Sequence, residues 1–142
     1  MIQPDELSIL LVEDEMSVRQ AIGRTLERSG YTVVAAEDGQ KAIDVVTKMG
    51  SQLAGVLLDM TMPILGGAEV LRHLKRLAPR LPVIGSSGHS EITARADFGN
   101  EDLAGFVQKP YSSTTLVEAV TEALSRHSWT ASTSGSERFH SL

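Results

Sequence analysis

The sequence predicts an α/β fold in which a doubly wound, five-stranded parallel sheet lies between two layers of helices. Two observations predict this class. Short apolar runs alternate five times with segments in which apolar residues recur at helical spacing. The runs are also almost continuously apolar, which is typical of parallel strands that are buried on both faces. We therefore expect five helices and a three-layer α/β/α arrangement.

The individual elements follow from these patterns in chain order. The expected strands are residues 7–12, 31–36, 54–58, 82–86 and 104–107. A first helix over 16–29 carries apolar residues at i, i+3, i+4 and i+7, and Gly30 is suited to close it. Asp38 is suited to cap a second helix that stops at Gly50. Three more helices are expected after the 63–67 loop up to Pro79, near 90–98 with poor periodicity, and over 113–126.

The length and composition indicate one domain of ordinary size. The chain has 142 residues, of which 42% are apolar and 22% are charged, as expected of a globular protein. We assign residues 1–126 to the folded domain. Residues 127–142 are rich in Ser and Thr and lack an apolar period, so we expect a disordered tail or a linker.

Several classes of protein are disfavoured by composition. The sequence has no cysteine, no apolar run long enough to span a membrane and no secretory signal, which fits a cytoplasmic protein. The net charge is −5. The densest basic group is Arg72, Lys75, Arg76 and Arg80, which we interpret as a solvated helix face. Direct binding of nucleic acid is therefore not expected.

Polar residues gather where the expected strands end. In open parallel sheets, ligands bind outside the carboxyl ends of the strands. If the first and third strands are neighbours, the carboxylates of Glu13, Asp14 and Asp59 converge there. Three carboxylates that close cannot all stay ionised unaided, so a proton or a cation must join them. Mg²⁺ (or Mn²⁺) suits these oxygen ligands best.

Groups that suit a phosphate lie at the other strand ends. Lys109 supplies a positive charge, and Ser87 and the amide of Gly88 supply hydrogen-bond donors. Which of Ser86 and Ser87 faces the site depends on register, and we favour Ser87 because Gly88 follows it. A carboxylate such as Asp59 can be the nucleophile that takes a phosphoryl group beside a cation.

Four segments in this order resemble a known family. LLVEDE, LLDMTMPILGG, PVIGSSG and FVQKP make the chain similar, over about residues 7–126, to the response-regulator receiver domain of two-component signalling. The resemblance implies a flavodoxin-like sheet with strand order 2-1-3-4-5. The stretches GSSGHSE and LAGFVQKPYSSTTL are similar to receivers at the C-terminus of hybrid sensor histidine kinases.

The resemblance also implies a role for each matching residue of the acidic site. Asp59 would be the phosphoacceptor. Asp14 would bind Mg²⁺ directly and Glu13 through water, with the backbone carbonyl of Thr61 completing the protein ligands. Lys109 would pair with the phosphoryl group.

Four further positions have implied switch or structural roles. Ser87 would be the hydroxyl that moves towards the phosphoryl group, and Phe106 would be the aromatic switch, although it can equally be a core residue. Lys109–Pro110 would be a cis peptide, and Gly67 would serve the loop that precedes the third helix.

The function that follows is regulatory. The resemblance implies that a histidine kinase or a histidine phosphotransfer domain supplies the phosphoryl group. A downstream protein would then read the face made by helix four, strand five and helix five. The domain would be no enzyme beyond self-phosphorylation from small donors and self-dephosphorylation.

Three alternatives stay open from the residues alone. A haloacid dehalogenase-type aspartyl-phosphate phosphatase needs a second Asp where Thr61 stands. A flavin or nucleotide binder would lack a Gly-rich phosphate loop after the first strand. An interaction module that works without phosphorylation would not need the full set of acidic and basic residues.

Overall fold

A computed structural model describes residues 8–62, 65–97 and 103–136 of the chain; for Asp97 and residues 127–136 it describes the backbone alone. Five parallel strands form one sheet in the order β2-β1-β3-β4-β5, which confirms the predicted fold class and strand order. The strands are β1 (Ser8–Val12), β2 (Thr32–Ala36), β3 (Gly55–Asp59), β4 (Val83–Ser87) and β5 (Gly105–Gln108).

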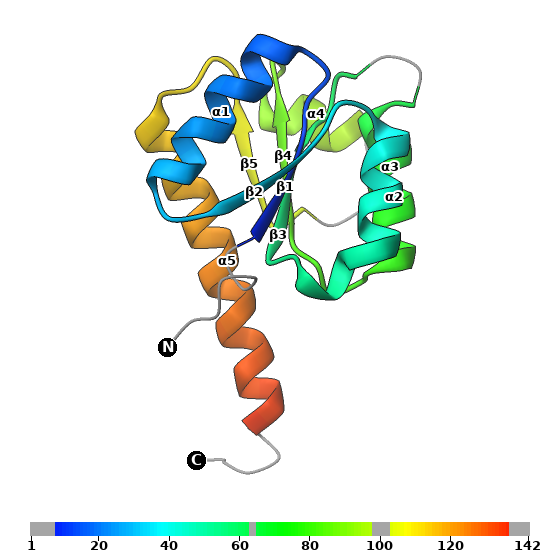
Figure 1. Ribbon diagram of the computed structural model, residues 1–142, viewed down its shortest axis with the longest axis vertical. Helices are drawn as coiled ribbons and strands as arrows, with labels where there is room; N and C mark the ends of the chain where they lie inside the picture. Colours follow the sequence, from blue (N-terminus) through cyan, green and yellow to red (C-terminus); the bar gives the residue numbers. More distant parts are fainter. Residues whose placement is uncertain (1–7, 63–64, 98–102, 137–142) are drawn as a thin grey trace.

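Helices cover both faces of this sheet (Figure 1). They are α1 (Met16–Arg28), α2 (Gly39–Met49), α3 (Gly67–Leu77), α4 (Glu91–Asp97) and α5 (Ser113–Ser136), with a 3₁₀ turn η2 (Gly50–Gln52) after α2. The strands and the first four helices lie within a residue or two of their predicted positions.

The core consists of two apolar clusters, one on each face of the sheet. One cluster joins the sheet to α2, α3 and α4 through buried residues such as Val46, Leu71 and Ala94. The other joins it to α1 and α5 through residues such as Leu26 and Val120. Since β1, β3 and β4 are buried along their whole length, their apolar runs are explained by burial on both faces.

Local signals at the helix ends behave as their chemistry predicts. Gly30 has a φ of +100°, the left-handed conformation that glycine adopts without steric cost after a helix. Asp38 caps α2, since its Oδ1 accepts a hydrogen bond of 2.8 Å from the Lys41 amide.

The predicted end of the last helix was wrong. We expected α5 to stop at residue 126, with a disordered segment after it, but the helical backbone continues to Ser136. In Figure 1 this part of α5 projects beyond the sheet. The segment from 127 to 134 contains neither Pro nor Gly. Extending an existing helix needs no new nucleus, so a sequence without breakers continues it. The rest of the predicted tail, residues 137–142, lies outside the described residues.

Gly67 has a steric role at the start of α3. A Cβ added there would lie 2.5 Å from the Met60 Cα and 2.9 Å from the Met60 carbonyl oxygen. The obstacle is the backbone that follows Asp59, so it cannot move aside as a side chain could. Gly67 therefore lets α3 begin directly against the segment that carries the acidic site. Pro63, at the start of the same loop, lies outside the described residues.

We predict that Gly67→Ala destabilises the protein by about 1–3 kcal/mol, the typical cost of overpacking, because the backbone of Met60 cannot move aside. Gly66→Ala is the matched control, since a Cβ there meets nothing within 4 Å. It should change the free energy of unfolding by less than about 1 kcal/mol, because alanine is a poorer N-cap than glycine but adopts the extended backbone of Gly66 without strain. Urea denaturation measures both variants. Equal stabilities would contradict the steric role of Gly67.

Candidate functional site

The acidic residues meet because β1 and β3 are neighbours in register. Val12 pairs with Leu58, so the residues that follow each strand emerge at the same edge of the sheet. Carboxylate oxygens of Glu13, Asp14 and Asp59 all lie within 4.8 Å of one another. Glu13 and Asp59 are buried and Asp14 is exposed. This donor set could hold a metal ion, because three closely spaced carboxylates are typical ligands of a hard divalent cation.

Lys109 reaches this cluster from the end of β5. Its Nζ lies 3.0 Å from Glu13 Oε1 and 3.7 Å from Asp59 Oδ2. The side chains of Glu13 and Asp59 are only 4% and 5% exposed, and that of Lys109 is 27% exposed. One ammonium therefore faces two buried carboxylates, and the pocket keeps a surplus of negative charge.

The pKa shifts follow from this imbalance. Burial raises the pKa of Glu13, and the charge of Asp59 adds to the rise, whereas the hydrogen bond from Lys109 opposes it without cancelling it. Burial alone would lower the pKa of Lys109, but its hydrogen bond to Glu13 and the charges of Asp59 and Glu13 outweigh burial and raise that pKa. Lys109 is thus held in its charged form, while Glu13 still lacks enough positive charge around it.

Thr61 fixes one oxygen of Asp59. The backbone amide and the Oγ1 hydroxyl of Thr61 both donate to Asp59 Oδ1, at 3.1 Å and 3.0 Å. The other oxygen, Oδ2, is the one that faces Lys109. The carboxylate is therefore oriented, with one oxygen occupied by hydrogen bonds and the other turned towards the ammonium. The sequence analysis named the carbonyl of Thr61 as a metal ligand but did not predict that its hydroxyl bonds to Asp59.

Arg19 was also missed by the sequence analysis. From the first turn of α1, its guanidinium donates to the backbone carbonyls of Glu13, at 2.8 Å, and Asp14, at 3.4 Å. The Glu15 amide also donates to Glu13 Oε2 at 3.3 Å. These contacts hold the acidic segment between β1 and α1. An arginine six residues after a strand-end acid has no recognisable motif, so only the structure could identify it.

The two serines at the end of β4 lie on opposite faces of the sheet. Side chains alternate along a strand, so Ser87 shares the face of Val83, in the cluster covered by α2, α3 and α4, and Ser86 shares the face of Ile84. Phe106 is half-buried and packs against the same cluster as Val83. The Ser87 hydroxyl accepts a hydrogen bond of 3.0 Å from the amide of His89.

The backbone around Lys109 is tied to β4. The Lys109 amide donates to the Ser87 carbonyl at 2.7 Å. The Lys109–Pro110 peptide bond is cis, as predicted.

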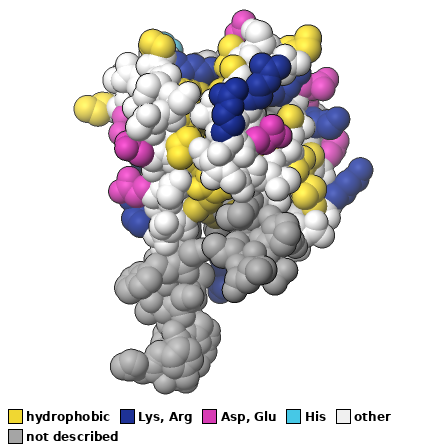
Figure 2. All heavy atoms as spheres, turned by 60° about the vertical axis from the view of Figure 1, so that its left-hand side comes forward, with side chains coloured by type: hydrophobic (Ala, Val, Ile, Leu, Met, Phe, Trp, Pro, Cys, Tyr) yellow, Lys and Arg dark blue, Asp and Glu magenta, His cyan; other side chains and the backbone are white. Residues whose placement is uncertain are grey.

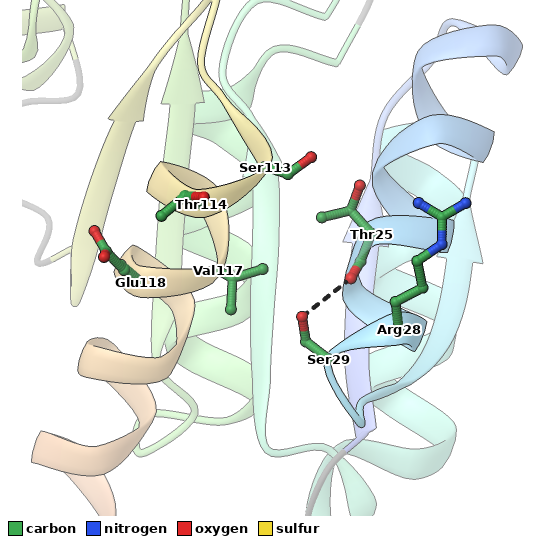
Figure 3. A pocket seen from close by; sticks show the side chains of 7 residues that line it. All are labelled: Thr25, Arg28, Ser29, Ser113, Thr114, Val117 and Glu118. Atoms are coloured by element: carbon green, nitrogen blue, oxygen red, sulfur yellow. Dashed lines mark hydrogen bonds between the residues drawn. The ribbon is translucent and has the colours of Figure 1, made fainter.

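A separate groove of about 340 Å³ lies between α1 and α5, away from the acidic cluster (Figure 3). It is lined by Thr25, Arg28, Ser29, Ser113, Thr114, Val117 and Glu118. The Ser29 hydroxyl is already bonded to the Thr25 carbonyl, at 3.2 Å. None of the residues predicted to form the site lines this groove.

On the described surface seen in Figure 2, several Lys and Arg side chains lie towards the top of the view. Acidic and basic side chains occur side by side there (Figure 2). Within the described parts of the chain, no helix has the length and apolar character needed to cross a membrane.

Comparison with known proteins agrees with this geometry. The family described as Response regulator receiver domain matches residues 9–121. Sensor kinase CckA of Brucella abortus is 34% identical over 119 residues, which cover 84% of this chain and 13% of that protein. Response regulator MprA of Mycolicibacterium vanbaalenii is 31% identical over 121 residues, which cover 83% of this chain and 50% of that protein.

Solved structures give the same result. The receiver domain protein of Clostridium thermocellum superposes with a TM-score of 0.79 at 28% identity, covering 86% of this chain and 97% of that one. NtrX of Brucella abortus superposes with a TM-score of 0.82 at 25% identity, covering 90% of this chain and 29% of that one.

The fold and the site define a regulatory domain of two-component signalling. This chain belongs to the response regulator receiver domain family. Receiver domains are phospho-accepting regulatory domains that take their phosphoryl groups from histidine kinases, and none of the proteins named above is an aspartyl-phosphate phosphatase. The chain spans only 13% and about half of the two curated relatives, which are therefore longer proteins.

We predict that Arg19→Met lowers the affinity for Mg²⁺ about tenfold, because groups that orient metal ligands contribute about that much to binding. The lost contacts would free the segment that carries Glu13 and Asp14. Arg24→Met is the matched control, since Arg24 is an exposed arginine on the same helix. Calorimetric titration with Mg²⁺ compares the two. Loss of a positive charge alone would raise the affinity for Mg²⁺ in both variants, so an unchanged or raised affinity in Arg19→Met would contradict the positioning role of Arg19.

Proposed function

We propose that Asp59 is the residue that accepts the phosphoryl group, from a phosphohistidine of a histidine kinase or of a histidine phosphotransfer domain. The observation that carries this proposal is the asymmetry of its carboxylate. Oδ1 is occupied by two hydrogen bonds from Thr61, whereas Oδ2 faces Lys109 at 3.7 Å. Oδ2 is the oxygen available as a nucleophile.

The transfer itself exchanges one bond for another. A lone pair of Asp59 Oδ2 forms the new O–P bond as the N–P bond of phosphohistidine breaks. The bonding electrons return to the imidazole nitrogen, which takes up a proton. Lys109 stabilises charge on the phosphoryl oxygens, because an ammonium beside a buried acceptor favours the negative transition state.

Glu13, Asp14 and Asp59, with the Thr61 carbonyl, would hold Mg²⁺ (or Mn²⁺). The three carboxylates fit this ion by chemistry and spacing. Burial raises the pKa of Glu13, and the hydrogen bond from Lys109 does not offset it, so an added cation would favour the ionised carboxylate. When bound, the ion neutralises charge on the transferring phosphoryl group. The protein's own part is to orient Asp59 through Thr61 and to hold the acidic segment through Arg19.

The phosphoryl group would then act as a switch. It adds roughly −1.5 to −2 charges at neutral pH. Ser87 would exchange its bond with the His89 amide for one with a phosphoryl oxygen, and Phe106, on the same face of the sheet, would turn into the space that Ser87 leaves. The face formed by α4, β5 and α5 would carry this change to a downstream protein. A nearly complete switch requires that the active form be favoured by about 5.5 kcal/mol.

The wider context is part of the same proposal. The similarity to a sensor kinase and to response regulators supports a cytoplasmic receiver within a phosphorelay, and a histidine kinase as a possible parent chain. We keep residues 1–126 as the receiver domain, with the segment from 127 as a connector or tail. Self-phosphorylation from small donors and self-dephosphorylation would be its only reactions.

The acceptor is tested by incubating the protein with acetyl phosphate and Mg²⁺. We predict one added phosphoryl group on Asp59, and its loss in Asp59→Asn or when Mg²⁺ is chelated. Intact-mass spectrometry followed by peptide mapping locates the modification. Asp38→Asn, which changes only an exposed cap of α2, is the control and should be modified normally. Modification of Asp59→Asn at the wild-type rate would refute the assignment.

The switch is tested by NMR with beryllofluoride, a mimic of the phosphoryl group. We predict that the ring resonances of Phe106 shift in the wild type and stay unshifted in Ser87→Ala, because the alanine cannot move towards the mimic. Ser90→Ala, which removes the hydroxyl bonded to the Thr93 amide in α4, is the control and should keep the Phe106 shift. An unchanged Phe106 shift in Ser87→Ala would contradict the coupling.

A further inference from the structure

Two hydroxyl groups behind the acidic site have no part in the reaction described so far. Tyr111 Oη and Ser86 Oγ are both shielded from solvent, and neither makes a hydrogen bond to any described residue. Buried polar atoms without partners are rare, because each costs about 1–3 kcal/mol when left unbonded. The pair therefore requires a physical explanation.

The two hydroxyls lie on the same side of the sheet. Ser86 shares the face of Ile84, and Tyr111 packs against the apolar cluster that contains Ile84. Ser86 is also close enough to Tyr111 to oppose, as a hydrogen-bond donor, the rise that burial causes in the pKa of the phenol. The two groups are neighbours that stop short of a well-formed hydrogen bond.

Ser86 lies beside the strand of Asp59, and Tyr111 lies beside Lys109 in the chain. Ser86 pairs with Asp59 in the register of β3 and β4, and it directly precedes Ser87. Tyr111 lies two residues after Lys109, whose amide is bonded to the Ser87 carbonyl. A bond between Ser86 and Tyr111 would join the strand next to the acceptor to the segment that carries the lysine.

In the unmodified protein, Lys109 is held more closely by Glu13 than by Asp59. Its Nζ is bonded to Glu13 at 3.0 Å and lies 3.7 Å from Asp59. A phosphoryl group on Asp59 draws the ammonium towards itself and away from Glu13. Tyr111 follows Lys109 by two residues, so a shift of the lysine that includes its backbone would carry the tyrosine ring with it.

We propose that Tyr111 is a positioning residue for phosphoryl acceptance: its hydroxyl bonds to Ser86 Oγ when Lys109 moves onto the phosphoryl group. The bond satisfies, only in the phosphorylated form, two groups that are unbonded in the unmodified protein. Tyr111 and Ser86 thus stabilise the arrangement in which Lys109 contacts the phosphoryl oxygens. This inference rests on the proposed function of Asp59 and Lys109.

Binding of beryllofluoride with Mg²⁺, followed by NMR titration, tests the inference. Tyr111→Phe and Ser86→Ala should each weaken binding roughly threefold to tenfold, the effect of one hydrogen bond. The double variant Ser86→Ala/Tyr111→Phe should lose no more than either single variant, because the same bond is removed. In a Lys109→Met background, Tyr111→Phe should have no further effect, since Tyr111 acts through Lys109.

The thermal midpoint of the unmodified protein separates this role from a merely structural one. Tyr111→Phe keeps the ring and removes an unbonded hydroxyl, so the midpoint should stay the same or rise. Tyr31→Phe is the matched control, because it removes a tyrosine hydroxyl bonded to Thr121 Oγ1 at 2.8 Å far from the site. It should leave the affinity for beryllofluoride unchanged.

Three results would overturn the inference: unchanged beryllofluoride affinity in Tyr111→Phe, additive losses in the double variant, or a lowered midpoint in unmodified Tyr111→Phe. The last would show that the bond already exists before phosphorylation. If Asp59 is not the phosphoryl acceptor, the binding experiment gives a different result. In that case the wild type would not bind beryllofluoride, or Asp59→Asn would bind it equally well.

Discussion

The burial of two carboxylates beside one ammonium is the constraint on which this domain depends. Glu13 and Asp59 emerge from neighbouring parallel strands into a pocket that excludes most solvent, and Lys109 compensates only part of their charge. Leaving a buried charge without compensation costs several kcal/mol, so the pocket favours any species that adds positive charge. The same imbalance makes Glu13, Asp14 and Asp59 a donor set that could hold a divalent ion.

The surrounding structure keeps this pocket in shape. Gly67 lets α3 start against the backbone of Met60, directly after the acceptor strand. Thr61 leaves one oxygen of Asp59 free, and Arg19 holds the acidic segment by its carbonyls. The backbone amide of Lys109 donates to the Ser87 carbonyl, and that of Met60 donates to the Ser86 carbonyl, so hydrogen bonds join the segments of Lys109 and Asp59 through β4. In the proposed function, these hydrogen bonds are the route by which a charge on Asp59 would reach β4 and β5.

The sequence predicted the fold well where the apolar pattern of a segment and the residues at its ends indicate the same element. The buried strands are continuous apolar runs between helices of clear period, and Gly30 and Asp38 have the conformation and the contact that their residue types favour. The prediction that Glu13, Asp14 and Asp59 converge, because they lie at the carboxyl ends of neighbouring parallel strands, is confirmed. The end of α5 was missed because residues after 126 lack an apolar period yet contain no helix breaker before Gly135. Arg19 and the hydroxyl pair of Ser86 and Tyr111 depend on contacts between separate elements, which spacing along the chain cannot reveal.

A crystal structure of the domain with Mg²⁺ and beryllofluoride tests the central claim most directly. The account predicts one ion held by oxygens of Glu13, Asp14 and Asp59, beryllofluoride attached to Asp59 Oδ2, and the Lys109 ammonium displaced from Glu13 towards the fluorine atoms. Density for the ion or for beryllofluoride anywhere else, with Lys109 still bonded to Glu13, would contradict it.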